Sequence, residues 1–369
     1  MEAKFILSQK AVLEQYSKLK NLGTEISYSY KTNRKVGNVL QELAECSDCS
    51  FSLHNIEEIG MIKIRNKIFF FPQAWNQSEI EQIIQSGVRM FVIDNEADLK
   101  ELINFLNKDE DDKNKDKDKN SKEKIKVDIC LRMKIQEHRI GSGKYFIYGM
   151  PAGKVNSIIK ELSANPSIDK IGIHIHRKSQ NTSEWNIKAE LEDSLADETL
   201  KRLSFAILGG GLPAEYKSYS SAVLPYIFSR IKEAGEWLAK RNIKAYIEPG
   251  RFIAAPSVKL RAEIIQVYDS IIVINCSLYN CALDTLLTNT KMLVQGELPD
   301  SDNSGSSAEG QFYLIKGNTP TRDDIFRYKV KLKHPKPGDK IVFLNAGAYS
   351  YATDFCSLQK LRTEVRKEF

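Results

Sequence analysis

Four segments of this chain end an apolar, strand-like run on residues that could do chemistry. Segments 25–31 and 170–176 end on a lysine and a histidine, and segment 204–211 ends on three glycines. Segment 243–251 carries Glu-Pro-Gly-Arg after its apolar residues. A lysine amine can bond to an aldehyde, glycines let backbone amides approach a phosphate, and a carboxylate can keep a ring nitrogen protonated. Together these features are typical of a site for a phosphorylated aldehyde cofactor.

Pyridoxal phosphate is the cofactor that would use all of these groups. Lys31 is the candidate for the Schiff base, because neighbouring cations and partial burial can lower the pKa of its amine. Glu248 would pair with the pyridine nitrogen and keep it protonated. The protonated ring is the electron sink that loss of CO₂ from an α-carbon requires. His176 would stack against the ring and limit its movement.

The expected phosphate contacts come from a glycine turn and an arginine. Backbone amides can approach a phosphate closely at the three glycines Gly209, Gly210 and Gly211. Arg251 would add a charge-assisted contact to the same region. Each feature alone has a structural explanation, since a strand-end lysine is usually solvated and a glycine triplet is usually a turn. Their joint occurrence in strand order favours the cofactor site.

Two further histidines lie near the expected site. His174 precedes His176 by two residues, and we expect its side chain to face the opposite side of the strand as a structural histidine. His54 follows another predicted strand, and its place at a strand end leaves a cofactor contact open.

The pattern of apolar runs predicts eight strand and helix units. Short runs alternate with stretches of helical period, as in a parallel (β/α)8 barrel closed by a ring of helices. The predicted strands are residues 25–31, 49–54, 68–73, 88–94, 127–135, 170–176, 204–211 and 244–250. The predicted helices are residues 10–22, 77–85, 96–106, 155–162 and 221–240. In such a barrel the C-terminal strand ends build the active site, and the residues above lie there.

A second domain is expected after the barrel. We assign residues 1–24 to an N-terminal segment that packs on either domain, 25–255 to the barrel, and 256–369 to a mainly antiparallel β domain. The strands predicted in that domain are residues 258–267, 270–279, 291–296, 311–317, 326–332 and 340–344. Residues 108–126 hold eight lysines against seven acidic residues, so we expect a solvated surface insertion there.

Composition argues against several classes of protein. The net charge is +6, but opposite charges are interspersed, so nucleic-acid binding is not expected. No apolar run is long enough to span a bilayer and the first residues lack the apolar core of a signal peptide, which predicts a cytoplasmic protein. The six cysteines would then be reduced thiols. Cys46 and Cys49 have zinc-finger spacing, but no second pair completes a four-ligand set, so we expect no metal site.

In these motifs the chain resembles the fold-type III pyridoxal-phosphate decarboxylases, which act on ornithine, arginine, diaminopimelate and carboxynorspermidine. The resemblance runs from about Glu25 to Phe355 and rests on the segments 28–33, 131–132, 173–180, 208–213, 248–251 and 345–349. It implies a barrel followed by a β domain, and a homodimer with its sites at the interface. It implies that the cofactor is bound by Lys31, Arg132, His176, Ser179, Gly209, Gly210, Gly211, Glu248, Arg251 and Tyr349.

The chain departs from the pattern of this family at three places. The family cysteine that is thought to reprotonate the substrate carbon falls at Pro320 or Thr321, and neither is a thiol. Ser52 stands where the family often has an aspartate, which resembles the carboxynorspermidine branch. Lys178 replaces the glycine before the phosphate-binding serine.

We therefore expect decarboxylation of a basic amino acid or polyamine precursor: ornithine, arginine, lysine, diaminopimelate or carboxynorspermidine. Asp323 or Asp324 of the partner subunit would contact a distal substrate amine. Two alternatives stay open, a racemase of the same fold type and a regulator that lost its chemistry with the cysteine. Glu248 argues against the racemase, which usually has an arginine at the ring nitrogen, and Lys31 together with Glu248 argues against the regulator. The sequence does not identify the substrate.

Overall fold

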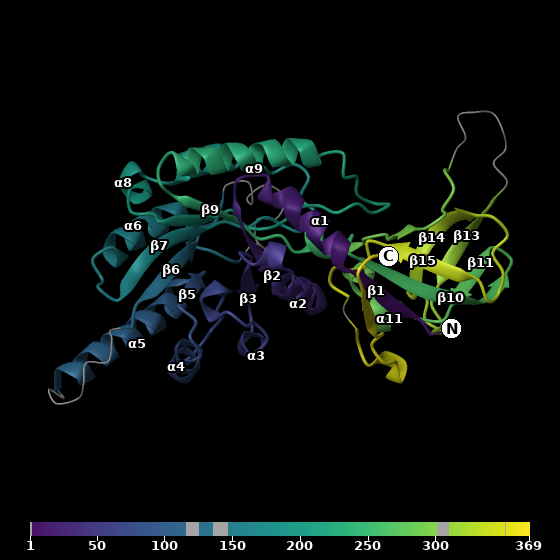
Figure 1. The fold of residues 1–369 in the computed structure, drawn as a ribbon, viewed down its shortest axis with the longest axis horizontal. Coiled ribbons are helices and arrows are strands. Elements are labelled where there is room, and N and C mark those ends of the chain that lie inside the picture. Colours follow the sequence, from purple (N-terminus) through teal and green to yellow (C-terminus); the bar gives the residue numbers. More distant parts are fainter. Residues whose placement is uncertain (1, 116–124, 136–146, 301–309, 351) are drawn as a thin grey trace.

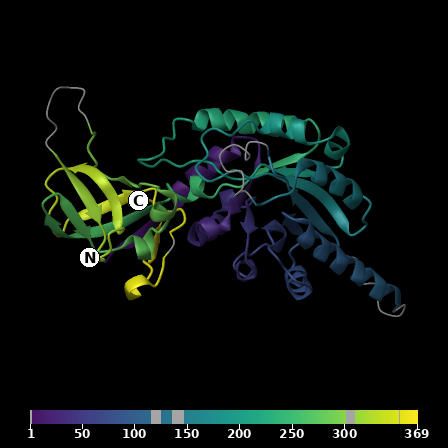
Figure 2. The same ribbon diagram turned by 180° about the vertical axis from the view of Figure 1, so that it is seen from behind.

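The computed structural model describes residues 2–115, 125–135, 147–300, 310–350 and 352–369. Figure 1 shows two parts side by side, a barrel ringed by helices and a sheet domain that holds both ends of the chain. Figure 2 shows the same division from behind, with helix α9 (Leu224–Ala239) lying along the outside of the barrel. The fold class expected from the sequence is confirmed.

Eight parallel strands close the barrel. Each strand pairs with the next along the chain, and β2 pairs with β9. The strands are β2 (Glu25–Ser29), β3 (Ser50–Leu53), β4 (Ile68–Phe70), β5 (Met90–Ile93), β6 (Val127–Arg132), β7 (Ile168–His174), β8 (Phe205–Ile207) and β9 (Lys244–Ile247). Each overlaps its predicted range, and all eight end earlier than predicted because the chain turns into the site there.

One helix precedes the first barrel strand, and the others follow the strands around the barrel. They are α1 (Gln9–Lys20), α2 (Arg34–Glu42), α3 (Ile56–Ile59), α4 (Gln77–Gln85), α5 (Glu96–Lys115), α6 (Ala152–Leu162), α7 (Ile187–Ser194), α8 (Asp197–Leu200), α9 and α10 (Arg251–Ala254). Helix α5 runs past its predicted end into the charged insertion, because extending an existing helix gains a hydrogen bond for each residue added. Residues 116–124 of the predicted insertion 108–126 lie outside the described residues. No helix in the described ranges is long and apolar enough to cross a membrane.

Two apolar clusters hold the barrel together. Side chains alternate between the two faces of a strand, so one set points into the barrel and the other toward the helices. The inner cluster consists of Phe69, Met90, Val92, Cys130, Phe205 and Ile207. Val92 also lines a cavity of the barrel, so this cluster reaches the wall of that cavity.

The sheet domain combines residues from both ends of the chain. Its strands are β1 (Lys4–Ser8), β10 (Val258–Tyr268), β11 (Ile271–Ile274), β12 (Leu293–Val294), β13 (Gln311–Lys316), β14 (Ile325–Leu332), β15 (Lys340–Leu344) and β16 (Thr363–Arg366). Most pairs are antiparallel, and β1 pairs in parallel with β16 while β11 pairs in parallel with β13. The division at residue 255 stays our proposal, with β1 belonging to the second domain.

The strand predicted over 270–279 ends at Ile274. The chain turns there into two short helices, α11 (Leu278–Cys281) and α12 (Asp284–Thr288). A capping box between Ser277 and Asn280 starts α11, and this local hydrogen bonding outcompetes the strand. Helix α12 brings an acidic side chain toward the barrel.

Candidate active site

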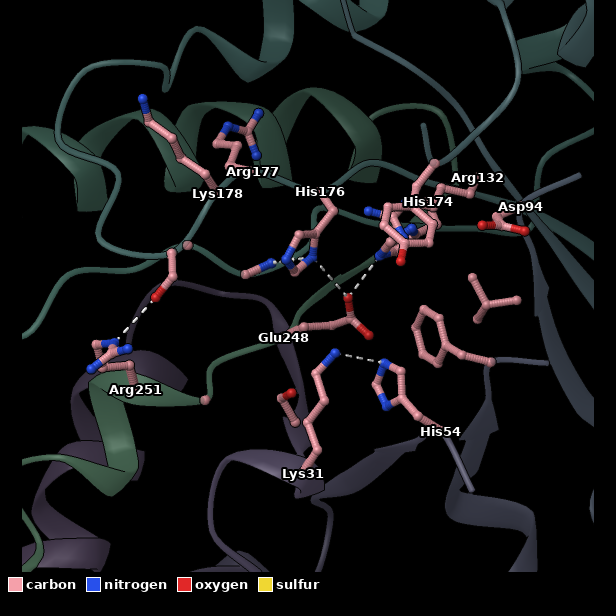
Figure 3. A pocket seen from close by; sticks show the side chains of 18 of the residues that line it. Lys31, His54, Asp94, Arg132, His174, His176, Arg177, Lys178, Glu248 and Arg251 are labelled. Carbon is pink, nitrogen blue, oxygen red and sulfur yellow. Dashed lines mark hydrogen bonds and ion pairs between the residues drawn. The ribbon is translucent and has the colours of Figure 1, made fainter. Parts of the chain in front are cut away.

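A cavity of about 390 Å³ opens at the C-terminal ends of the barrel strands. Figure 3 shows Lys31 on one side of it, facing Glu248 and a group of histidines. The predicted site residues on its lining are Lys31, Arg132, His176, Ser179, Gly210, Gly211, Glu248, Arg251 and Tyr349. The structure therefore brings together nearly all of the residues that the sequence pointed to.

Glu248 lies buried at the centre of the site, with both carboxylate oxygens engaged. Ser52 Oγ donates a hydrogen bond to Oε1 at 2.6 Å, and His174 Nε2 lies 2.7 Å from Oε2. Ser52 in turn lies 2.8 Å from Ser27, oxygen to oxygen. Burial alone would raise the pKa of Glu248, but His174 and His176 hold that pKa well below its usual value. The site therefore contains an ionised carboxylate.

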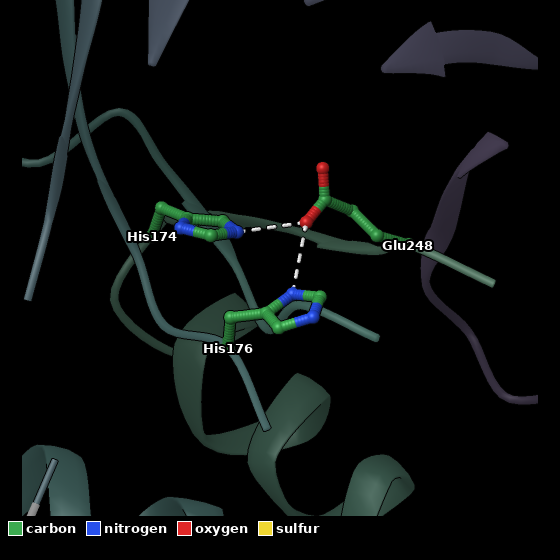
Figure 4. Close-up of side chains that lie close together, drawn as sticks. All are labelled: His174, His176 and Glu248. Atoms are coloured by element: carbon green, nitrogen blue, oxygen red, sulfur yellow. Dashed lines mark hydrogen bonds and ion pairs between the residues drawn. The ribbon is translucent and has the colours of Figure 1, made fainter. Parts of the chain in front are cut away.

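His174 and His176 face the same carboxylate, as Figure 4 shows. His174 Nε2 is 2.7 Å and His176 Nδ1 is 3.8 Å from Glu248 Oε2. The expectation that His174 faces away was wrong, because residues two apart on a strand share a face. Burial lowers the pKa of both imidazoles, that of His176 to about 4. Neutral His174 then carries its proton on Nε2, since the carboxylate can only accept.

The same three side chains have ligand atoms within 4.8 Å of one another. Such a group of nitrogens and an oxygen is of the kind that can hold a metal ion. Here, however, the donors are already in use: His174 donates to Glu248, and His176 Nδ1 accepts the Gly210 N–H at 3.3 Å. A metal ion at this place would have to displace both hydrogen bonds.

Lys31 stands in the 3-10 turn Tyr30–Thr32 that follows β2. Its Nζ lies 3.2 Å from His54 Nε2, so His54 belongs to the site. The side chain faces the open cavity, yet protein surrounds the amine. Burial lowers the pKa of Lys31 against the opposing pull of Glu248, and Arg132 adds to the lowering. A lowered pKa increases the fraction of lysine present as the neutral, nucleophilic amine at a given pH.

The glycine turn fits tightly between β7 and β9. Gly209 and Gly211 have φ of +70° and +95°, which side chains other than glycine rarely adopt. A Cβ on Gly209 would lie 2.1 Å from the Ile175 carbonyl oxygen, and one on Gly210 would lie 2.7 Å from that of Glu248. Gly210 and Gly211 line the cavity. Their missing side chains leave a cradle of bare backbone of the kind that a phosphate fits.

Arg251 is buried at the start of α10 and already has an anionic partner. Its guanidinium binds both carboxylate oxygens of Asp284 in α12, at 2.8 and 3.1 Å. Its Nε donates to Ser179 Oγ at 3.1 Å, which leaves the serine O–H able to donate elsewhere. Burial would lower the pKa of Arg251, but Asp284 raises it. Arg251 therefore holds Ser179 in place, and its own phosphate contact stays a prediction.

Tyr349 brings the sheet domain to the edge of the cavity. Its ring lies 4.9 Å from the Arg251 guanidinium, and its backbone N–H donates to the Thr32 carbonyl at 3.0 Å. Asn33 Nδ2 donates to the Gly347 carbonyl at 2.7 Å. These bonds tie the segment around Tyr349 to the turn that carries the site lysine.

Arg132 ends β6 on the side of the cavity opposite Arg251. Its guanidinium lies 5.1 Å from the centre of the Tyr148 ring. Burial lowers the pKa of Arg132, while Glu248 and Asp94 raise it. Asp94 also lines the cavity, so this end of the site offers both a cation and an anion.

Asp323 and Asp324 lie outside the cavity within one chain. Asp324 is fully buried and accepts hydrogen bonds from the Leu278 N–H at 2.8 Å and from Thr319 Oγ1 at 2.6 Å. Its carboxylate is therefore used inside its own loop. Asp323 is exposed, so of the two predicted substrate contacts it is the one that another chain can reach.

Sequence reasoning missed several contacts. Asp284 has no motif around it and meets Arg251 only through the fold. Phe71, which stacks on His54, and Asp94 both follow strands, so their place at a strand end was a usable signal. The alternation of His174 with His176 was also a usable signal, once read correctly.

Comparisons with known proteins agree with this geometry. Residues 9–255 match the model of a protein family described as pyridoxal-dependent decarboxylase, pyridoxal binding domain. No curated protein sequence matches the chain at a significant level.

Several solved structures share the fold across the whole chain. The lysine/ornithine decarboxylase from Vibrio vulnificus, complexed with putrescine, is 20% identical and has a TM-score of 0.73, covering 100% of this chain and 95% of that one. The diaminopimelate decarboxylase from Helicobacter pylori, complexed with L-lysine, is 17% identical with a TM-score of 0.77, covering 100% and 92%. The lysine decarboxylase from Selenomonas ruminantium is 15% identical with a TM-score of 0.77, covering 100% and 93%.

Proposed function

Because the chain belongs to the family of pyridoxal-dependent decarboxylases, with pyridoxal phosphate as cofactor, we propose that it releases CO₂ from a basic amino acid or a polyamine precursor. The candidate substrates are ornithine, arginine, lysine, diaminopimelate and carboxynorspermidine. The observation that carries this proposal is the ionised, buried Glu248 across one cavity from an amine of lowered pKa, Lys31. Glycine backbone that a Cβ would overlap completes the fit to the cofactor.

Each side chain has a defined task in this proposal. When bound, pyridoxal phosphate supplies an aldehyde and an electron-withdrawing ring. Lys31 would hold it through the amine, and Glu248 would keep a proton on the ring nitrogen. His176 would flank the ring. A set of backbone and hydroxyl groups would hold the phosphate: Gly209, Gly210, Gly211, Ser179 and Tyr349.

The charges around the cavity bear on the choice of substrate. Arg132 could bind a substrate carboxylate, and Asp94 could meet an amine at the same end of the site. Similar solved proteins are described with putrescine, cadaverine or L-lysine bound, which supports a substrate with a distal amine. In a homodimer, Asp323 of the partner subunit would add a second acidic contact.

We also propose an oligomeric state and a cellular location for the protein. A homodimer with sites at its interface would use the edge of the cavity that Tyr349 borders. All six cysteines are free, which suits a reducing cytoplasm and a role in polyamine or amino-acid metabolism.

A second candidate function is a regulator without turnover. Its support is the loop 317–324, which has no cysteine near Pro320 and Thr321. The intact arrangement of Lys31 and Glu248 argues against it, because a binding partner alone needs neither an amine of lowered pKa nor an ionised buried carboxylate.

The test is CO₂ release from the five candidate substrates by protein loaded with pyridoxal phosphate. We expect release from at least one, loss of release in K31A, and normal release in K35A, which changes an exposed lysine in the adjacent helix. Loaded protein that releases CO₂ from none of the five would contradict the proposal. Racemisation of a substrate without CO₂ would favour the racemase instead.

A further inference from the structure

The imidazole of His54 makes its only hydrogen bond with Lys31 among the residues that the structure describes. His54 Nε2 lies 3.2 Å from Lys31 Nζ. Its ring also lies face to face with Phe71, with centroids 4.8 Å apart and planes 9° apart. The stacking fixes the orientation of the ring, and in that orientation Nε2 points at the amine (Figure 3).

Packing does not account for a histidine at this position. His54 is exposed, and it lies between the site cavity and a second cavity of about 300 Å³. Both cavities share His54, Phe71, Pro72 and Gln73 as lining. An aromatic ring without nitrogen would form this wall equally well. The distinctive property of the imidazole is therefore its contact with Lys31.

The charge state of His54 and the tautomer of its ring together set the direction of the hydrogen bond. Although solvent reaches His54, the protein around its ring desolvates it and lowers its pKa to about 3, with Lys31, His176 and Arg132 adding to the effect and Glu248 opposing it. The imidazole is therefore neutral, and in the tautomer protonated on Nδ1 its Nε2 lone pair accepts a hydrogen from Lys31 Nζ. An imidazole of such low basicity orients the amine and does not take its proton.

We propose that His54 is the positioning residue of Lys31, holding the amine toward the cavity through Nε2 while Phe71 holds the ring. A lysine side chain is long and flexible, so a hydrogen-bond partner at its end restricts the positions that the amine occupies. The proposal rests on the proposed role of Lys31 in holding the cofactor. The charged groups that face Lys31 besides His54 are Glu248, Arg132 and Glu58, and the test leaves them unchanged.

Three variants separate the effect of the hydrogen-bond acceptor Nε2 from the effect of the stacked ring. H54F keeps an aromatic ring for stacking and removes the acceptor. H54Q restores an acceptor through its amide oxygen. Q73A changes another residue of the same wall, for which the described residues show no hydrogen bond to the lysine amine, and serves as the matched control.

Two measurements on cofactor-free protein report on Lys31 without any turnover. The first is competitive labelling with acetic anhydride over a range of pH, read for Lys31 by peptide mass spectrometry. The second is the rate at which added pyridoxal phosphate becomes fixed to Lys31 by borohydride at alkaline pH. Both detect a change at the amine that a purely structural role of His54 would not produce.

The acceptor stabilises the charged amine, so its loss in H54F should move the labelling midpoint to lower pH. The expected shift is about one pH unit, or roughly tenfold in the fraction of free amine. Fixation of pyridoxal phosphate at alkaline pH should be several-fold slower in H54F because the amine is no longer held toward the cavity. H54Q should recover most of both effects, and Q73A should match the unchanged protein.

An unchanged midpoint and an unchanged fixation rate in folded H54F would overturn the proposal. If H54F does not fold, F71L decides, because it keeps Nε2 but frees the ring; it should shift both readouts in the same direction by a smaller amount. No shift in folded F71L would then overturn the proposal. A normal response of Lys31 to these variants without CO₂ release from any substrate would refute the proposed function and leave this inference intact.

Discussion

Replacing Ser52 with alanine removes one of the hydrogen bonds that hold the central carboxylate. Ser52 Oγ donates to Glu248 Oε1 at 2.6 Å, and both residues are buried. A hydrogen bond to a charged group contributes about 1.5–3 kcal/mol. S52A should therefore lower the free energy of unfolding by about 2 kcal/mol near neutral pH.

The effect should depend on pH in a defined direction. The folded-state pKa of Glu248 is depressed, so its contribution is present above the unfolded-state pKa of about 4.3 and is lost as pH falls through the folded-state value. Loss of a donor raises the folded-state pKa toward its usual value. The difference in free energy of unfolding between S52A and the unchanged protein should stay constant from neutral pH to about pH 5. Below that pH the difference should become smaller.

Urea denaturation of cofactor-free protein, followed by tryptophan fluorescence, measures this difference. All three tryptophans, Trp75, Trp185 and Trp237, belong to the core of the barrel. S27A is the matched control, because it removes only the neutral Ser27–Ser52 contact of 2.8 Å, which contributes about 1 kcal/mol without pH dependence. A loss in S52A no larger than in S27A, or equal at every pH, would refute the reasoning.

Three further predictions concern the rest of the site and its supports. G210A should abolish binding of pyridoxal phosphate measured by absorbance, because its Cβ would lie 2.7 Å from the Glu248 carbonyl oxygen, whereas G153A meets nothing within 4 Å and should bind normally. R251M should lower the free energy of unfolding by about 3–5 kcal/mol, because it leaves the Asp284 carboxylate buried and unpaired, and R251M/D284N should recover part of that loss in urea. D324N should lower the melting temperature, since the buried carboxylate accepts from Leu278 and Thr319, whereas exposed D323N should leave it unchanged; equal effects would contradict this assignment.

Local patterns in the sequence predicted much of the fold and of the candidate site. Strand-length apolar runs alternating with helical ones predicted the closed parallel barrel, and that architecture alone places every strand's C-terminal end at one rim. Lys31, His176 and Glu248 therefore converge although they are far apart in the chain. The glycine turn was predictable because only glycine tolerates its backbone angles and its close approach to Ile175.

Contacts that depend on the fold as a whole were not predictable. Asp284 reaches Arg251 from a short helix in a stretch where the sequence predicted no element. Strand β1 joins the sheet of the C-terminal residues through pairing with β10 and β16, which nothing in residues 4–8 indicates. The end of helix α5 was missed because a charged run can extend a helix that buried residues have already started.

The most direct test of the account is the site at which borohydride fixes pyridoxal phosphate to the purified protein. The account predicts that peptide mass spectrometry finds the cofactor on Lys31 and that K31A carries none. A cofactor fixed at another lysine, or a K31A protein that is labelled as fully as the unchanged one, would contradict it.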